Sequence, residues 1–305
     1  MTISQQRPGT PPTSDDADAS GSAVSANSRP TPMSRADRDR IDSSALPQLG
    51  ATMFVGAANV IMQLSHPSVG YGVAESRVDS GSAEKHPIKR SRTTFTYLAV
   101  ATMGTPAERK AYRRAVGQSH AQVRSTEDSP VSYNAFDPEL QLWVAACLYK
   151  GWEDAQRVFG DPSLITEESY RAGAVMGTTL QMPAEMWPAT RADFDEYWDK
   201  TVATLHIDPF IRERLLGLAR LENMPPLVRR VLAKNSEIMA IGFLPQEFRD
   251  MLGVNLTPAQ EKYFHRHNAI TRQLVRYMPR PVREFPFNWM LADFRWRLRT
   301  GRPLV

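Results

Sequence analysis

The sequence predicts an all-α protein, a multi-helix bundle whose core is formed by amphipathic helices. Apolar residues recur at spacings of three and four, as in Leu46, Leu49, Met53, Ala57, Val60, Ile61 and Leu64. The alternation of apolar and polar residues that is typical of strands is absent from the sequence. Cofactor sites in helical folds of this kind are commonly housed between helices, so we expect a pocket there.

The first element, residues 1–44, is expected to be a disordered N-terminal arm. It is rich in Ser, Pro, Thr, Asp and Ala, and it offers too little apolar surface to offset the entropy lost on ordering. It also contains no apolar stretch that could serve as the core of a signal peptide. We therefore expect a cytoplasmic protein. Residues 45–305 contain no internal linker, so we expect them to form a single helical domain.

Proline, glycine, aspartate and threonine mark the ends of the expected helices. His66-Pro67 closes the first helix, and Asp137-Pro138 opens a long apolar one. Thr105-Pro106-Ala107-Glu108 supplies a capping threonine, a first-turn proline and a glutamate at the third helical position. With these limits we expect helices at about 46–64, 93–103, 107–123, 138–159, 166–180, 191–205, 209–221, 227–239, 245–252, 258–277 and 288–299.

The composition excludes several classes of protein. With 305 residues and 42% apolar content the chain can bury a sizeable core. Its net charge of +4 comes from scattered cations without a recognisable reading motif, so we expect no nucleic-acid binding. The longest apolar runs are shorter than the roughly 20 residues that span a bilayer. Cys147 is the only cysteine, and its apolar neighbours predict a buried thiol in a reducing compartment.

The C-terminal arginines alternate with aromatic residues, among them Phe285, Trp289 and Trp296. Such a segment would suit an anionic membrane surface. A helix that packs on the core and exposes its charged face is the simpler interpretation, and we favour it. We likewise expect the six tryptophans to pack in the core.

Arg92, Thr96 and His120 are the candidate site residues. Arg92 and Thr96 are four residues apart and share one helix face, while His120 lies in the next helix. A guanidinium, a hydroxyl and an imidazole facing one apolar pocket suit a bound haem, because imidazole ligates iron and the polar pair holds propionates or a polar reactant. The alternative is a surface arginine, a threonine bonded to its own helix backbone and a core histidine bonded to a carbonyl.

Further motifs surround these residues: Gln63-Leu64-Ser65-His66-Pro67-Ser68-Val69-Gly70-Tyr71-Gly72-Val73, Arg92-x3-Thr96, Gly104, His120-x2-Val123, Tyr133-x-Ala135-x-Asp137-Pro138-x4-Trp143-Val144, Leu180-x2-Pro183-Ala184-Glu185-Met186-Trp187-Pro188, Asp193-Phe194-x2-Tyr197 and Phe243-Leu244-Pro245-x3-Arg249. In their order and spacing, from about Leu46 to Arg299, the chain resembles the haem-binding rubber-oxygenase-like family. This family, also known as domain of unknown function 2236, includes latex clearing proteins and MpaB-type oxygenases. Each motif alone is unspecific.

The resemblance implies a haem b-dependent oxygenase, an oxidoreductase that uses dioxygen to oxidise a small apolar substrate of lipid or isoprenoid type. It implies that His120 is the axial iron ligand and that Arg92 and Thr96 line the pocket as catalytic residues. One departure is Ser125, which stands where the family often has a glycine after the valine of its histidine motif. This departure affects the expected geometry of the ligand more than its identity.

A second hypothesis is a non-catalytic haem carrier or sensor, in which His66 also ligates the iron and closes it. His66 lies where the first helix breaks, with Glu75 close behind, so this segment is a candidate for the opposite wall of the pocket. Glu75 would then be a candidate general base. The alternative for the pair is a turn histidine and a solvated glutamate.

Overall fold

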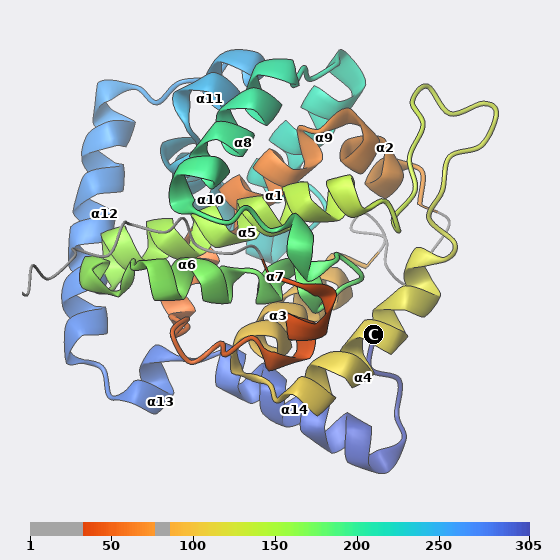
Figure 1. The fold of residues 1–305 in the computed structure, drawn as a ribbon. Coiled ribbons are helices and arrows are strands. Elements are labelled where there is room, and N and C mark those ends of the chain that lie inside the picture. Colours follow the sequence, from red (N-terminus) through yellow and green to blue (C-terminus); the bar gives the residue numbers. More distant parts are fainter. Residues whose placement is uncertain (1–32, 77–85) are drawn as a thin grey trace, which may run out of the picture. The chain divides into compact units, whose positions relative to one another are not determined.

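Helix α5 (Pro138–Phe159) lies at the centre of the described structure, with other helices on several sides (Figure 1). The computed structural model describes residues 33–76 and 86–305, which belong to one compact unit. Fourteen of the 22 residues of α5 are buried, and the helix contacts α1, α6, α7 and α12. Its start follows the predicted chemistry, because the Asp137 side chain accepts a hydrogen bond from the Glu139 amide at 2.9 Å.

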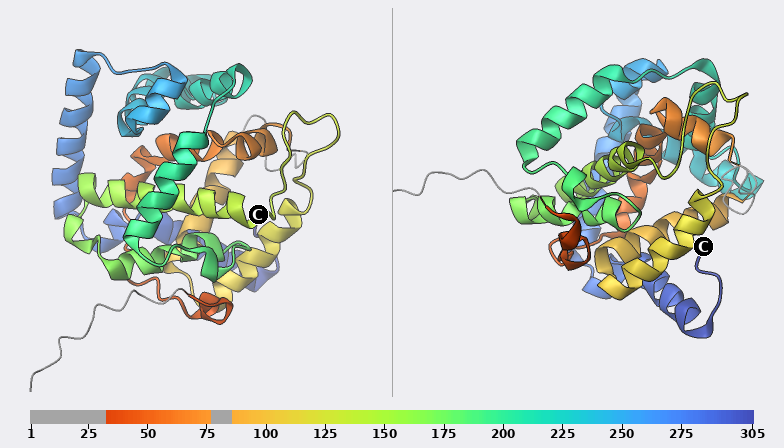
Figure 2. Two further views of the ribbon diagram at one scale, coloured as in Figure 1. Left: turned by 45° about the horizontal axis from the view of Figure 1, so that its top comes forward. Right: turned by 45° about the vertical axis from the view of Figure 1, so that its right-hand side comes forward.

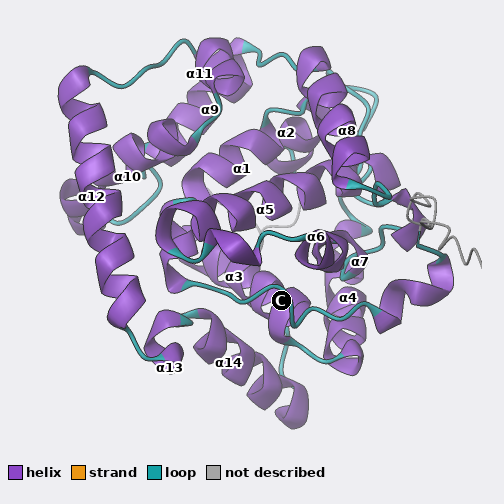
Figure 3. Cartoon of the chain, turned by 60° about the vertical axis from the view of Figure 1, so that its left-hand side comes forward, coloured by secondary structure: helices purple, strands orange, loops and turns teal. Residues whose placement is uncertain are grey.

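The regular structure of the described residues is helical, and Figure 3 shows no strand among them. The α-helices are α1 (Gly56–Leu64), α2 (Pro67–Ala74), α3 (Pro87–Met103), α4 (Pro106–His120), α5, α6 (Glu167–Gly173), α7 (Val175–Thr178), α8 (Arg191–Thr204), α9 (Pro209–Ala219), α10 (Pro226–Phe243), α11 (Gln246–Leu252), α12 (Pro258–Tyr277), α13 (Arg280–Arg283) and α14 (Phe287–Thr300). Short 3-10 segments are η1 (Arg35–Arg40), η2 (Gly50–Phe54), η4 (Pro162–Leu164) and η5 (Ala184–Met186). The predicted all-α fold class is therefore confirmed.

Helices α3, α4 and α14 pack together on one side of α5 (Figure 2). Phe95 of α3 meets Phe287 of α14 edge to face, with ring centroids 5.8 Å apart. Tyr112 of α4 meets Phe294 of α14 in the same way at 5.7 Å. These fully or partly buried aromatic pairs fix α14 against the two helices that carry the candidate site residues.

A second aromatic cluster joins α5 to α6 and α8. It consists of Tyr149, Tyr170, Trp187 and Phe194, whose ring centroids are all 5.6–5.8 Å apart. The buried Tyr170 hydroxyl donates to the Pro188 carbonyl at 2.6 Å, so its polar end is satisfied. Two of these residues, Trp187 and Phe194, belong to the motifs that carry the family resemblance, which indicates that those motifs specify packing.

Several helix limits differ from the sequence prediction. The predicted helix at 46–64 becomes η2 and α1, and 166–180 becomes α6 and α7. Helix α2 begins directly at Pro67, because a proline that ends one helix is also well suited to the first turn of the next. The prediction of disorder over 1–44 lies outside the described residues for 1–32. In the described part, η1 forms and the Ile41 carbonyl accepts a hydrogen bond from buried Arg109 at 2.9 Å.

The burial of Cys147 is confirmed, and burial raises the pKa of its thiol well above the ordinary value. Four tryptophans are buried as predicted: Trp143, Trp152, Trp187 and Trp198. The prediction is wrong for Trp289 and Trp296, which are exposed on α14. None of the described helices combines the length and the hydropathy that crossing a bilayer requires.

Candidate functional site

His120 is the last residue of α4, and the sequence defines this helix at both ends. Thr105 caps the first turn by accepting from the Glu108 amide at 3.2 Å, while the Glu108 carboxylate accepts from the Thr105 amide at 2.8 Å. The Ala121 amide then closes the helix on the Gly117 carbonyl. The histidine is thereby held at the point where α4 turns into the loop before α5.

The His120 ring lies among groups from three other segments. Phe136 meets it edge to face with ring centroids 6.3 Å apart, the Gln181 side chain forms a hydrogen bond with it, and the positive charge of Arg90 on α3 acts on it. Gln181 is itself fixed, because Gln141 of α5 donates to its side-chain oxygen at 3.1 Å and accepts from its backbone amide at 3.0 Å. The ring therefore lies beside the segment before α5 and the segment after α7, and it feels the charge of a residue on α3.

Burial, aided by the charge of Arg90, lowers the pKa of His120 from its ordinary value of 6.5 to about 4, against the hydrogen bond with Gln181 that raises it. A histidine at a helix C-terminus would by itself favour the charged form by about 0.3–1 kcal/mol. A pKa difference of about 2.5 corresponds to about 3 kcal/mol, so burial outweighs the helix dipole. The imidazole is neutral at neutral pH.

His120 Nδ1 is a buried polar atom without a hydrogen-bond partner, although the residue as a whole is only half-buried. An unpaired buried nitrogen is destabilising unless a ligand or water occupies the site. Neutral imidazole with an unengaged nitrogen is the form that binds metals.

His66 also has a buried Nδ1 without a partner, and it caps the start of α2. Burial lowers its pKa, while the charge of Asp137 raises it. Its ring lies against Trp143 of α5, with centroids 6.5 Å apart. Gln141 is the α5 residue that is linked to His120 through Gln181. It is two positions before Trp143, so the two residues lie about 200° apart around the helix. His66 thus contacts α5 through Trp143, whereas His120 is linked to α5 through Gln181.

Arg92 and Thr96 lie on α3 as predicted, but their contacts lead elsewhere. The Thr96 hydroxyl is buried and lies 3.8 Å from Sδ of Met290 on α14. The charge of Arg92 acts on Tyr112 of α4, which Arg90 also reaches. Among the described residues no hydrogen bond or ion pair joins His120 to Arg92 or Thr96. The roles of these two residues thus stay predictions.

Sequence reasoning missed Arg90, Gln181 and Gln141. Arg90 and Arg92 are two residues apart, so they lie on different faces of α3. Only the packing of α3 on α4 decides which of the two arginines lies near His120. Glutamines carry no recognisable metal or acid–base signature in a sequence. Their signal is the burial of Gln141, which is 4% exposed and must have partners.

Glu75 is a hydrogen-bonded residue. Its Oε2 accepts from the Ser129 hydroxyl at 2.7 Å and from the Tyr133 hydroxyl at 2.8 Å. These residues line a polar surface pocket of about 120 Å³ together with the loop that follows α4. The interpretation of Glu75 as a simply solvated glutamate is therefore wrong, and its carboxylate holds the loop to the end of α2.

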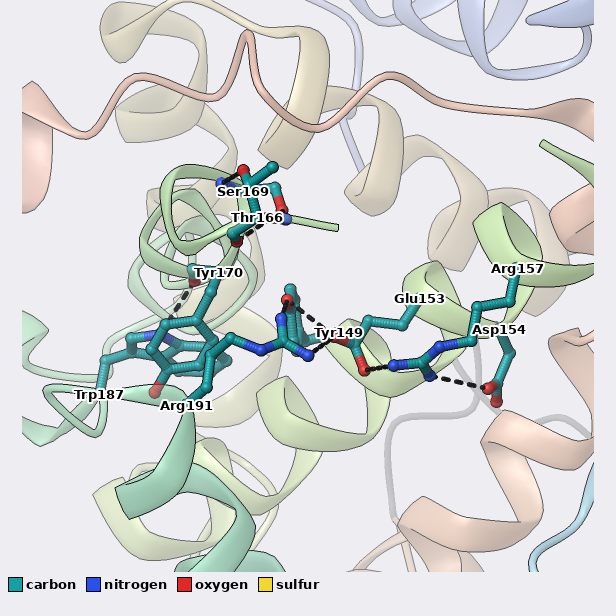
Figure 4. Close-up of polar contacts among 9 residues, drawn as sticks. All are labelled: Tyr149, Glu153, Asp154, Arg157, Thr166, Ser169, Tyr170, Trp187 and Arg191. Carbon is teal, nitrogen blue, oxygen red and sulfur yellow. Dashed lines mark hydrogen bonds and ion pairs between the residues drawn. The ribbon is translucent and has the colours of Figure 1, made fainter. Parts of the chain in front are cut away.

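A buried ionic network fixes the middle of α5 (Figure 4). The Glu153 carboxylate is 2% exposed and pairs with Arg191 at 2.6 Å and with Arg157 at 3.2 Å. The Tyr149 hydroxyl donates to Glu153 at 3.0 Å. Burial raises the pKa of the neighbouring Asp154 to about 6, although the charge of Arg157 lowers it. Because these groups satisfy one another, the network has a structural role in holding α8 on α5.

Comparisons with known proteins show which family the chain resembles. Residues 47–276 match the family model described as ER-bound oxygenase mpaB/B'/Rubber oxygenase, catalytic domain. Two relatives, Uncharacterized protein Rv2237 of Mycobacterium tuberculosis and Uncharacterized protein Mb2261 of Mycobacterium bovis, are each 47% identical over 255 residues, which is 83% of this chain and 100% of each relative. A comparison with solved structures finds no match.

Proposed function

Because the chain belongs to the MpaB and rubber oxygenase family, we propose that it is a haem b-dependent oxygenase with His120 as the protein ligand of the iron. The matched region is an oxygenase catalytic domain. The substrate that we propose is small and apolar, of lipid or isoprenoid type, and dioxygen is the co-substrate. The lone buried Cys147 is consistent with the reducing environment of the cytoplasm, where we place the reaction.

The observation that supports this proposal most directly is the state of His120. Haem iron requires a neutral imidazole, and burial of His120 supplies one. One ring nitrogen is enclosed without a partner, and Gln181 limits the orientation of the ring. The residues present therefore fit a haem ligand.

The charged start of α3 would complete the haem site. Arg90 reaches His120 by its charge, and Arg92 follows on the same helix. A guanidinium beside the ligand is suited to a propionate carboxylate, which it binds through charge-assisted hydrogen bonds. We propose Arg90 for this role and Arg92 for orienting a polar reactant. Thr96, with its hydroxyl toward Met290, would support the position of α3.

Haem, when bound, supplies the activation of dioxygen that these side chains cannot perform. The chain's own contribution is to keep His120 neutral and to hold its ring beside Gln181 and Phe136.

The rival function is a haem carrier or sensor in which His66 closes the second coordination position. His66 packs against Trp143, whereas His120 lies beside Phe136 and Gln181, and we take this difference as support for His120 as the single protein ligand. An iron with one open position is what oxygen activation needs, whereas two histidine ligands would close it. We therefore propose the oxygenase in preference to the carrier.

The test is an absorption spectrum of the full chain, expressed with added haem precursor, with iron and porphyrin quantified. We expect one haem per chain and a spectrum that changes on addition of carbon monoxide. His120→Ala should remove the haem, whereas His66→Ala and the exposed control His265→Ala should keep it. A normal spectrum for His120→Ala would refute the ligand assignment. A low-spin spectrum that ignores carbon monoxide would favour the carrier.

A further inference from the structure

The outer side of α14 carries two exposed tryptophans. Trp289 and Trp296 are 55% and 41% exposed and seven residues apart, so they share one face of the helix. The opposite face holds Phe287 and Phe294, which are fully buried. Packing on the core is thus already satisfied by other aromatic residues of α14. The two indoles make no contribution to the core that would explain them.

The residues just before α14 in the sequence also include exposed apolar side chains. Val282 is 54% exposed and Phe285, between the two helices, is 58% exposed. Soluble proteins seldom expose several large apolar side chains so close together unless the surface has a partner. The other four tryptophans of the chain are buried, unlike Trp289 and Trp296. A partner with an apolar component is therefore indicated for this surface.

The same segment carries a strong positive charge. Residues 277–305 contain six arginines and two carboxylates, a formal charge of +4 that equals the net charge of the whole chain. Arg302 lies over the Trp296 ring, with the guanidinium carbon 4.4 Å from its centroid. Arg283 and Arg299 form no ion pair with a described residue, so their charges stay available. The partner is expected to be anionic as well as apolar.

We propose that α13, α14 and the segment around them form a peripheral docking surface for an anionic lipid bilayer. Tryptophan prefers the boundary between headgroups and acyl chains, because its ring is apolar and its N–H is polar. Arginines near such a surface are attracted by the anionic headgroups. A nucleic acid would use the arginines but gives no reason for exposed Val282 and Phe285.

The proposed surface lies outside the region that matches the oxygenase family, so it can have a separate role. The region that matches the oxygenase family ends at residue 276, immediately before α13. Helix α14 packs on α3, the helix that carries Arg90 and Arg92, so a bilayer at this surface would lie on the far side of α14 from α3. The proposal does not depend on haem or on turnover.

The experiment is co-sedimentation of the full chain with vesicles of phosphatidylcholine containing phosphatidylglycerol, compared with vesicles of phosphatidylcholine alone. We expect binding to the anionic vesicles that weakens as salt is added. Trp289→Ala together with Trp296→Ala should weaken binding by about tenfold for each indole removed. Arg299→Gln and Arg302→Gln should each weaken it by about fivefold.

The matched control is Leu227→Ala with Val231→Ala on α10, which removes side chains that are 75% and 69% exposed but lie outside the proposed surface. This variant should bind vesicles like the unmodified chain. Circular dichroism and thermal unfolding confirm that every variant is folded. Absence of vesicle binding would overturn the proposal, as would equal binding by the tryptophan variant. A dimer or a nucleic-acid complex that is lost in the tryptophan variant, without vesicle binding, would assign the surface to that partner instead.

Discussion

The neutral state of His120 makes a quantitative prediction about stability and pH. Its pKa is about 4 in the folded chain and close to 6.5 when unfolded, so the unfolded chain takes up the proton first as the pH falls. The stabilisation is complete above pH 6.5 and is lost as the pH falls from 6.5 toward 4. The full difference corresponds to about 3 kcal/mol, and about 2 kcal/mol of it is lost by pH 5.

The measurement is urea unfolding of haem-free protein at pH 7.5 and pH 5.0, for the unmodified chain and for His120→Gln. Glutamine cannot be protonated, so the free energy of unfolding should fall by about 2 kcal/mol less between the two pH values than it does in the unmodified chain. His265→Gln, at an exposed position of α12, is the control and should leave the pH dependence unchanged. An equal pH dependence in the unmodified chain and His120→Gln, or an NMR titration of the His120 ring near pH 6.5, would refute the reasoning.

Two further predictions concern the scaffold. Glu153→Ala should lower the free energy of unfolding by about 2–3 kcal/mol, below the 3–5 kcal/mol typical of broken buried pairs, because Arg191 and Arg157 still reach water. Urea unfolding measures the change, and a loss under about 0.5 kcal/mol, as for an exposed pair, would contradict the burial of the carboxylate. Thr96→Val should change stability by less than about 1 kcal/mol and keep the haem content, because the contact to Met290 is a weak one. Thermal unfolding and porphyrin quantitation check this, and loss of haem would place the hydroxyl in the site.

The fold was largely predictable because its local signals agree with one another. The Asp137 cap, the apolar periodicity and the closing Gly160 all specify α5, and its limits match the prediction. The less accurate limits lie where local signals are ambiguous. Pro67 both ends α1 and opens α2, and α6 ends at Gly173, although Gly177 lies inside the next helix, α7. Tertiary packing decides such cases, and packing cannot be read from helical periodicity.

The site was predictable in residue type but less so in its neighbours. His120 could be singled out because the chain has only six histidines and this one lies in a helix with a clear N-terminal cap. The charge that acts on it comes from Arg90, which the sequence did not single out, because its position depends on how α3 rotates against α4. That rotation is set by contacts such as Phe95 with Phe287, which join residues far apart in the sequence. The exposure of Trp289 escaped prediction because a tryptophan at helical spacing is usually buried.

The low pKa of His120 also bears on ligand binding. A proton competes with any metal for the imidazole, so only the neutral fraction is competent to bind. At pH 5 an imidazole with a pKa of 6.5 would be about 97% protonated, which weakens ligation about thirtyfold. With a pKa of about 4 only about a tenth of the rings are protonated at that pH, so the penalty nearly disappears. Arg90 thus serves two purposes in the proposed site: its charge disfavours the protonated ring, and the same charge is available to a propionate carboxylate.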